Sequence, residues 1–217
     1  MTYKRMTIIE YNVSDILRDS YENKIGHIPS ALSLFQITKE LYGRDNPIVI
    51  GKSFGAQAWF VDAKVRENFL KSGKRILSVD DFLDSTFNVK YCQQQLGLAA
   101  GFAVGFSLSH KDEVTLCILS DGDLMMQSSL DAIEVAFQKK LPIKFIVDYN
   151  KVQLFGDMDC VSYIKHLNHS FDVIKYDRNT EIILITTKKG QGCPLMEERP
   201  KDWHYTILSK EQYDTLK

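Results

Sequence analysis

The sequence lacks several features that would point to whole classes of function. It has no uninterrupted apolar run of about 18 residues, so no segment predicts a helix that spans a bilayer. The first residues, 1–19, also lack the continuous apolar core of a signal peptide. Lys and Arg total 27 against 28 Asp and Glu, so no excess of positive charge points to nucleic acid or to an anionic membrane surface. We therefore expect a cytoplasmic protein that binds neither nucleic acid nor membrane.

Cysteine is scarce, and segments that would separate domains are missing. The four cysteines form no Cys-x-x-Cys pair and have no histidine nearby at ligand spacing; they are Cys92, Cys117, Cys160 and Cys193. The sequence therefore indicates neither a zinc site nor a disulfide framework. It also has no repeat, no low-complexity segment and no linker rich in Pro, Gly or Ser. We expect one domain over residues 1–217, which is long enough to bury an ordinary core.

The apolar residues predict an alternation of helices and strands. Helical spacing predicts helices over residues 30–43, 55–70, 94–110 and 124–140, and another near 160–169. Short apolar runs predict strands over residues 47–51, 113–120, 142–150 and 183–189. The strand, helix, strand unit within residues 113–150 implies parallel neighbours joined by a right-handed crossover. The predicted class is α/β, a mostly parallel sheet with helices on both faces.

Polar residues follow two neighbouring strands of this predicted sheet. Asp121-Gly122-Asp123 comes directly after the strand over 113–120, and Asn150 ends the strand over 142–150. In open parallel sheets, ligands bind beyond the carboxyl ends of the strands. Carboxylate and amide oxygens suit Mg²⁺, which commonly bridges to phosphate oxygens. The arrangement favours a metal held on a diphosphate, and the alternative is a pair of ordinary turns that end strands.

Three separated segments together resemble the transketolase family of thiamine diphosphate enzymes. The block LSDGDLMMQSSLDAIEVAFQKKLPIKFIVDYN, residues 119–150, is similar to the family's cofactor motif, in which Gly-Asp-Gly is followed further along by Asn. Residues 24–43 are similar to an N-terminal pattern of Gly-His, then Leu-Ser and a helix ending in Leu-Tyr. Residues 186–205 resemble the closing segment, in which a Lys-Gly-x-Gly turn leads to Met-Glu and Trp-His. The three segments come in the family's order and cover most of the chain.

The resemblance implies how the cofactor and its metal would bind. The side chains of Asp121 and Asn150 would bind Mg²⁺, and the carbonyl of Val152 would add a third protein ligand. Gly122 would let the backbone approach the diphosphate, and Asp123 in the same motif is a further candidate for cofactor binding. The implied cofactors are therefore thiamine diphosphate and Mg²⁺.

The resemblance also implies catalytic residues at both ends of the chain. His27 and His204 match family histidines that line the channel for cofactor and substrate, and His204 would also contact the cofactor. The alternative for each histidine is a hydrogen-bonded structural role. Gln94 lies where the family has Gly-Gln-Gly before an Ala-rich helix, so it is a further candidate for cofactor binding.

Three positions depart from the family pattern. Ser120 replaces the first glycine of Gly-Asp-Gly, while the aspartate and the second glycine are kept. Phe54 stands where transketolases carry a histidine that faces the sugar substrate, and Met126 stands where they carry a glutamate. The substrate and the carboxylate relay between paired active sites are therefore where this chain is expected to differ from the family.

The resemblance implies the N-terminal, diphosphate-binding subunit of a split transketolase-like enzyme. Such a transferase moves a two-carbon ketol unit from a ketose to an aldehyde, and the glutamate that activates the cofactor lies on a pyrimidine-binding domain. We therefore expect a separate pyrimidine-domain subunit, an α2β2 assembly, a small keto or sugar substrate, and no activity of this chain alone. The alternatives are the α-subunit of a 2-oxo acid dehydrogenase or decarboxylase, and a non-catalytic binding subunit that kept the fold.

Overall fold

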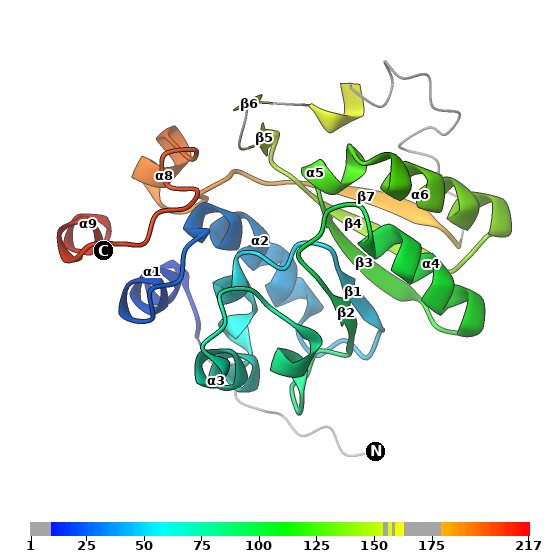
Figure 1. Ribbon diagram of the computed structural model, residues 1–217, viewed down its shortest axis with the longest axis horizontal. Helices are drawn as coiled ribbons and strands as arrows, with labels where there is room; N and C mark the ends of the chain where they lie inside the picture. Colours follow the sequence, from blue (N-terminus) through cyan, green and yellow to red (C-terminus); the bar gives the residue numbers. More distant parts are fainter. Residues whose placement is uncertain (1–9, 154–155, 158, 163–178) are drawn as a thin grey trace.

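A five-stranded parallel sheet forms the centre of the protein (Figure 1). The computed structural model describes residues 10–153, 156–157, 159–162 and 179–217. The strands lie in the order β2-β1-β3-β4-β7, and each neighbouring pair is parallel. Their bounds are β1 (Ile48–Ile50), β2 (Val89–Cys92), β3 (Thr115–Ser120), β4 (Ile143–Tyr149) and β7 (Glu181–Thr186). This sheet confirms the predicted α/β class. A separate antiparallel pair joins β5 (Val152–Gln153) to β6 (Gly156–Asp157).

Helices pack on both faces of the sheet, and the alternation along β3 shows why. Leu116 and Ile118 belong to one buried cluster, whereas Cys117 and Leu119 belong to the other, because successive side chains of a strand point to opposite faces. The first cluster is covered by α1 (Val13–Glu22), α2 (Ile28–Leu41) and α3 (Ala63–Ser72), and the second by α4 (Ala99–Ser109) and α6 (Gln127–Lys139). Within the described part of the chain, no helix is long and apolar enough to cross a membrane.

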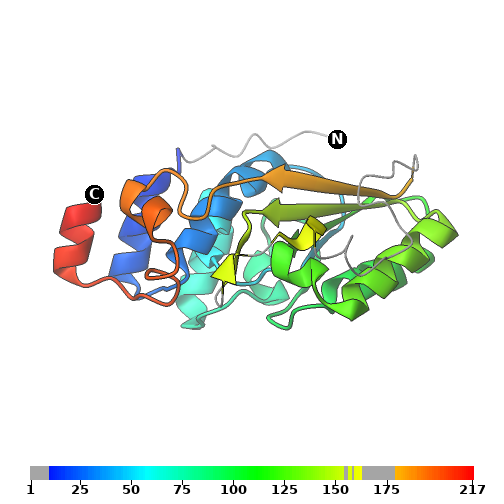
Figure 2. The same ribbon diagram turned by 90° about the horizontal axis from the view of Figure 1, so that it is seen from above.

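Elements from the two ends of the chain lie side by side. Figures 1 and 2 both place α9 (Lys210–Leu216) next to α1, with α8 (Pro194–Glu198) near them. The rings of Tyr21 and Tyr213 stack between α1 and α9, with centroids 4.6 Å apart. The sequence pattern predicted none of these three helices.

The helix predicted over residues 55–70 is interrupted at Asp62. Residues before it form the 3₁₀ helix η1 (Ala56–Val61), and α3 begins after it. The Asp62 carboxylate accepts hydrogen bonds from the amides of Lys64 and Val65 at 2.8 and 3.3 Å, and from the amide of Thr86 at 2.8 Å. Asp62 therefore caps α3. The apolar spacing continued across the cap, which is why the prediction of one helix was wrong.

Two other predicted helices begin later than expected. The helix predicted from residue 94 starts at Ala99, because the chain first turns at Gly97, whose φ is 87°. The helix predicted from residue 124 starts at Gln127, after the short helix α5 (Asp121–Leu124). The helix predicted near residues 160–169 lies outside the described residues, apart from residues 160–162, which are helical.

The connections of the sheet change direction between β1 and β3. From β1 the chain goes outward to the edge strand β2, then returns past β1 to β3 and continues through β4 to β7. Loops at the carboxyl ends of β1 and β3 therefore lead apart, and a crevice opens between them, which is where open α/β sheets bind ligands.

Gly55, which follows β1, allows the close approach that brings this loop to α2. Its φ is 80°, and a Cβ atom on it would lie 2.7 Å from the Ala31 amide nitrogen. Gly43 has a similar φ of 74° but no atom within 4 Å of such a Cβ. We expect Gly55→Ala to lower the free energy of unfolding by about 1–3 kcal/mol more than Gly43→Ala. Both substitutions place a side chain on a left-handed backbone, but only the new Cβ at position 55 is crowded. Urea denaturation of the two variants measures this difference, and equal losses would contradict it.

Candidate functional site

A cavity of about 260 Å³ lies at the carboxyl ends of β1, β3 and β4. Its lining brings together the start of α2, the ends of these strands and the segment that follows β7. Six residues that the sequence indicated line it, namely His27, Asp121, Gly122, Asn150, Val152 and His204. The switch point of the sheet therefore carries the residues of all three segments that suggested a family.

Two other candidates lie elsewhere. Gln94 is exposed and borders a separate surface depression with Lys74 and Cys92. Asp123 is fully buried, and its carboxylate accepts hydrogen bonds from the Gly97 amide at 3.0 Å and from the Ser120 amide at 2.9 Å. Asp123 thus holds the turn before α4 against the end of β3. Neither Gln94 nor Asp123 lines the cavity.

Asp121 presents an unpaired oxygen to this site. Its Oδ1 accepts hydrogen bonds from the Gly122 amide at 2.9 Å and from Gln153 Nε2 at 3.2 Å, whereas its Oδ2 is buried without a partner. Burial raises the pKa of Asp121, and the charge of Lys52 opposes that rise. Because a buried carboxylate oxygen without a partner is costly, Oδ2 is suited to a cation that enters the cavity. Gly122 adds no side chain here, and a Cβ on it would lie 3.2 Å from Gln153 Oε1.

Asn150 and Val152 bring two more oxygens to the cavity. The chain turns sharply between them, since Lys151 has a left-handed φ of 61°. Asn150 Oδ1 accepts a hydrogen bond from the Val152 amide at 3.1 Å, and the Val152 carbonyl accepts one from Lys189 Nζ at 3.1 Å. Together with Asp121 they form a carboxylate, amide and carbonyl set of the kind that binds Mg²⁺. No group of three or more His, Cys, Asp and Glu suited to a metal occurs among the described residues, so a metal here depends on these mixed oxygens.

A buried ion pair lies beside the cavity. Lys52 lines the cavity and forms a salt bridge with Asp148, which is fully buried at the end of β4. Asp148 also accepts hydrogen bonds from the hydroxyls of Ser33, at 2.8 Å, and Thr187. Burial opposes ionisation, but the Lys52 charge and these hydrogen bonds outweigh it and lower the pKa of Asp148. This pair was not predicted from the sequence, although Lys52 directly follows a predicted strand and Asp148 lies within another.

Lys189 is a second buried cation at the site, and sequence analysis missed it as well. It is 7% exposed, and it follows β7 within the predicted Lys-Gly-x-Gly turn. Burial and the nearby Lys52 charge lower the pKa of Lys189 to about 8. Two buried ammonium groups give this cavity a local attraction for anions such as phosphate.

The two histidines meet at the other side of the cavity. The ring centroids of His27 and His204 are 5.1 Å apart, with Phe54 4.3 Å from His27 and Tyr205 4.6 Å from His204. His27 Nδ1 is buried without a hydrogen-bond partner. Burial, followed by the charge of Lys189, lowers the pKa of both histidines to about 4. Both rings are therefore neutral near pH 7, so each can donate one hydrogen bond and accept another.

Comparison with known proteins identifies one domain family. Residues 71–159 match the family described as thiamine pyrophosphate enzyme, C-terminal TPP binding domain. No curated protein matches the chain. The matched segment contains Asp121, Asn150 and Val152 and leaves His27 and His204 outside. The match makes residues 71–159 similar to the cofactor-binding domain of thiamine pyrophosphate enzymes, and the parallel α/β fold agrees with it.

The neutral histidines predict a loss of stability in acid. The unfolded chain protonates histidine near pH 6.5, but the folded chain does so only near pH 4, so the unfolded state binds more protons between these values. This contribution to stability is complete above about pH 6.5 and falls as the pH drops towards 4. We expect the double variant His27→Gln/His204→Gln to lose less stability over this range than the wild type.

Urea denaturation at several pH values measures this effect. The exposed His110, which lies outside the cavity, offers a control, and His110→Gln should keep the wild-type profile. Identical pH profiles for the double variant and the wild type would show that the two cavity histidines do not cause the loss.

Proposed function

We propose that this chain is the diphosphate-binding subunit of a transketolase-like enzyme, which uses thiamine diphosphate and Mg²⁺ to transfer a two-carbon ketol unit from a ketose to an aldehyde. One observation carries the proposal: Asp121, Asn150 and Val152 line a single cavity at the switch point of the sheet, and Asp121 has a buried, unpaired oxygen there. The family match, which spans these three residues, supports the same cofactor.

The residues of the cavity suit both Mg²⁺ and the negatively charged diphosphate of the cofactor. Asp121, Asn150 and the Val152 carbonyl would hold Mg²⁺ against the diphosphate, and Gly122 leaves room for the backbone to approach it. The positive charges of Lys52 and Lys189 would add attraction for the diphosphate. When bound, thiamine diphosphate supplies the electron sink that stabilises a carbanion next to a carbonyl, while the protein binds, orients and moves protons.

The histidine pair supports transfer between sugars rather than binding alone. His27 belongs to the segment 24–43 and His204 to the segment 186–205. The two histidines are 177 positions apart in the sequence, yet their ring centroids lie 5.1 Å apart. Neutral imidazoles at this place would exchange protons with the hydroxyl and carbonyl oxygens of a ketose or aldehyde. A positioned acid or base typically contributes about 10²- to 10⁴-fold in rate.

A second candidate function is decarboxylation of a 2-oxo acid, as in the α-subunits of 2-oxo acid dehydrogenases. The apolar side chains of Phe54 and Leu96 line the cavity together with the cations Lys52 and Lys189. An apolar wall beside buried cations suits a carboxylate substrate with an apolar group. Phe54 packs directly on the His27 ring, so it would exclude part of the space that a polyhydroxylated sugar needs.

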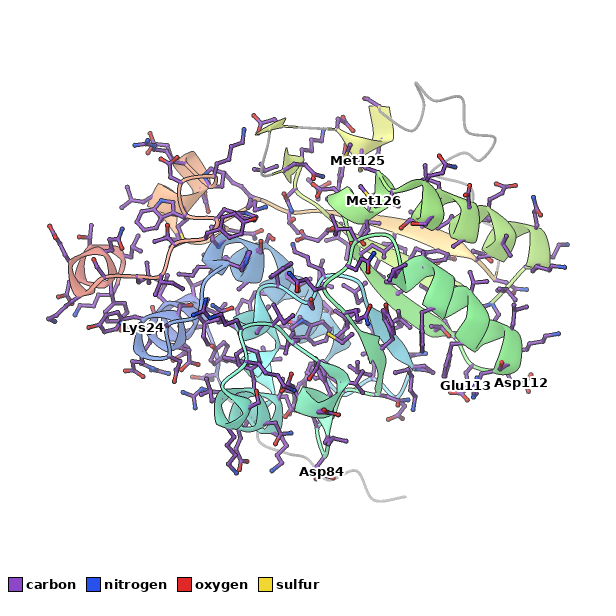
Figure 3. The ribbon with its side chains drawn as sticks, in the orientation of Figure 1. Lys24, Asp84, Asp112, Glu113, Met125 and Met126 are labelled. Atoms are coloured by element: carbon purple, nitrogen blue, oxygen red, sulfur yellow. The ribbon has the colours of Figure 1, made fainter. Side chains whose placement is uncertain are left out.

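We further propose that a separate pyrimidine-domain subunit covers the cavity. Leu96 and Tyr205 line its mouth and are 43% and 61% exposed, and Met126 is 36% exposed. Figure 3 shows Met125 and Met126 together between α5 and α6. An apolar surface of this kind beside a polar site is typical of a partner interface. The partner would supply the glutamate that activates the cofactor.

The outer face of α4 supports self-association into an α2β2 assembly. Leu98, Phe102 and Leu108 are exposed there, and Cβ atoms built on Gly101 and Gly105 would meet no atom within 4 Å. The face thus combines projecting apolar side chains with glycine notches. We propose that two copies of the chain pair through this face across a two-fold axis.

Replacing Asn150 tests the cofactor site. We expect Asn150→Ala to keep the fold and to weaken Mg²⁺-dependent binding of thiamine diphosphate at least about tenfold, because Mg²⁺ tolerates poor ligand geometry badly. Calorimetry in the presence of the partner chain measures the affinity. Asn46→Ala is the matched control, since Asn46 lies before the amino end of β1 and its side-chain Nδ2 donates a hydrogen bond to the Val114 carbonyl. Unchanged affinity in Asn150→Ala would refute the site.

A mixing experiment tests the split enzyme and its reaction. The full chain is assayed with thiamine diphosphate and Mg²⁺, first alone and then with a pyrimidine-domain protein encoded beside it. We expect activity only in the mixture, because the activating glutamate is supplied by the partner. Transfer from a ketose to an aldehyde would support the first function, and release of CO₂ from a 2-oxo acid the second. Full turnover by the chain alone would contradict the two-subunit proposal.

A further inference from the structure

The ammonium group of Lys189 is hydrogen-bonded to the Val152 carbonyl oxygen, which is one of the proposed metal ligands. Lys189 Nζ donates a hydrogen bond of 3.1 Å to the Val152 carbonyl. Over the ranges that the structure describes, Lys189 forms no ion pair within 4.0 Å, although its side chain is buried. Among the described residues, the hydrogen bond to this backbone carbonyl is the one that holds the charge in place.

The other charges around the cavity differ in how firmly they are held. Lys52 is fixed by its salt bridge with Asp148, so its ammonium group is held in place. Asp121 attracts Lys189 but forms no salt bridge with it, and its Oδ2 stays without a partner. Lys189 is therefore the cation of this cavity that has a flexible stem and little to hold it.

A divalent cation bound to Asp121, Asn150 and the Val152 carbonyl would meet this ammonium group. Both would compete for the same carbonyl oxygen, and two positive charges so close repel strongly in a partly dry cavity. This repulsion would displace the ammonium group from the carbonyl when the metal binds. An anionic diphosphate would favour that movement, since it offers Lys189 a charged partner.

We propose that Lys189 makes binding of the metal depend on the anion, by occupying the Val152 carbonyl until a diphosphate draws its ammonium group away. This inference rests on the proposed function, because it concerns the same metal site. It implies that metal and diphosphate each strengthen the binding of the other, and that Lys189 sets part of this coupling. In the protein without diphosphate, the metal site is held closed by the chain's own cation.

The test is titration of the full chain with Mn²⁺, read by electron paramagnetic resonance, with and without inorganic diphosphate. A protein-free titration accounts for Mn²⁺ that diphosphate binds in solution. Lys189→Met keeps most of the stem and removes the charge, so we expect it to bind Mn²⁺ at least about tenfold more tightly than the wild type without diphosphate. Added diphosphate should then strengthen Mn²⁺ binding less in Lys189→Met than in the wild type.

Three further variants separate charge from packing. Lys189→Arg keeps the positive charge and should retain the weak Mn²⁺ binding of the wild type. Lys188→Met is the matched control, because Lys188 is the exposed neighbour that pairs with Glu197 outside the cavity. Melting curves show whether Lys189→Met is folded. If it is not, Lys189→Gln, which keeps a hydrogen-bond donor without the charge, takes its place in the titration.

The outcomes distinguish this inference from the proposed function. Equal or weaker Mn²⁺ binding by Lys189→Met, with binding lost in Asn150→Ala, would overturn the role of Lys189 and leave the metal site in place. Absence of Mn²⁺ binding in every variant, with and without diphosphate, would overturn both. Tighter binding in Lys189→Met that disappears on adding Asn150→Ala would support both.

Discussion

The buried ion pair of Lys52 and Asp148 is the interaction on which the site depends. Lys52 follows β1 and Asp148 lies in β4, so the pair reaches across the carboxyl end of β3, the strand between them. Ser33 from α2 and Thr187 after β7 donate to the same carboxylate. Burying two charges is costly, and removing one partner typically costs about 3–5 kcal/mol. Such a pair adds little net stability. It does hold β1, β4, α2 and the segment after β7 together around the end of β3, where Asp121 lies.

The same pair sets the electrostatic character of the cavity. The charge of Lys52 contributes to lowering the pKa of His27, His204 and Lys189, in each case after burial. It therefore helps to keep the histidines neutral and weakens the hold of the cavity on a second cation. Burial raises the pKa of Asp121, and the charge of Lys52 opposes that rise. A single fixed charge thus acts on every titratable group that the proposed chemistry would use.

The features that could be predicted are those that show in a few consecutive residues of the sequence. Asp121 and Asn150 each directly follow a strand whose apolar run is visible in a few residues, so their place at one edge of the sheet could be inferred. The pairing of Lys52 with Asp148 joins positions 96 residues apart, and that of Lys189 with Val152 joins positions 37 apart, so no local pattern announces them. The turn at Gly97, which separates Gln94 from α4, likewise depends on a contact with Asp123, 26 residues further on.

The residues that line the cavity come from two parts of the chain, and this division bears on which substrate binds. The segment that matches the thiamine pyrophosphate family, residues 71–159, contains the three oxygens proposed for the metal. Both histidines, Phe54 and Lys189 lie outside that segment, and they line the rest of the cavity. Enzymes that share a cofactor need the first group of residues in common, whereas different substrates need different residues in the second. On the proposed function, the Phe54 ring against His27 is therefore the contact through which this chain would choose its substrate.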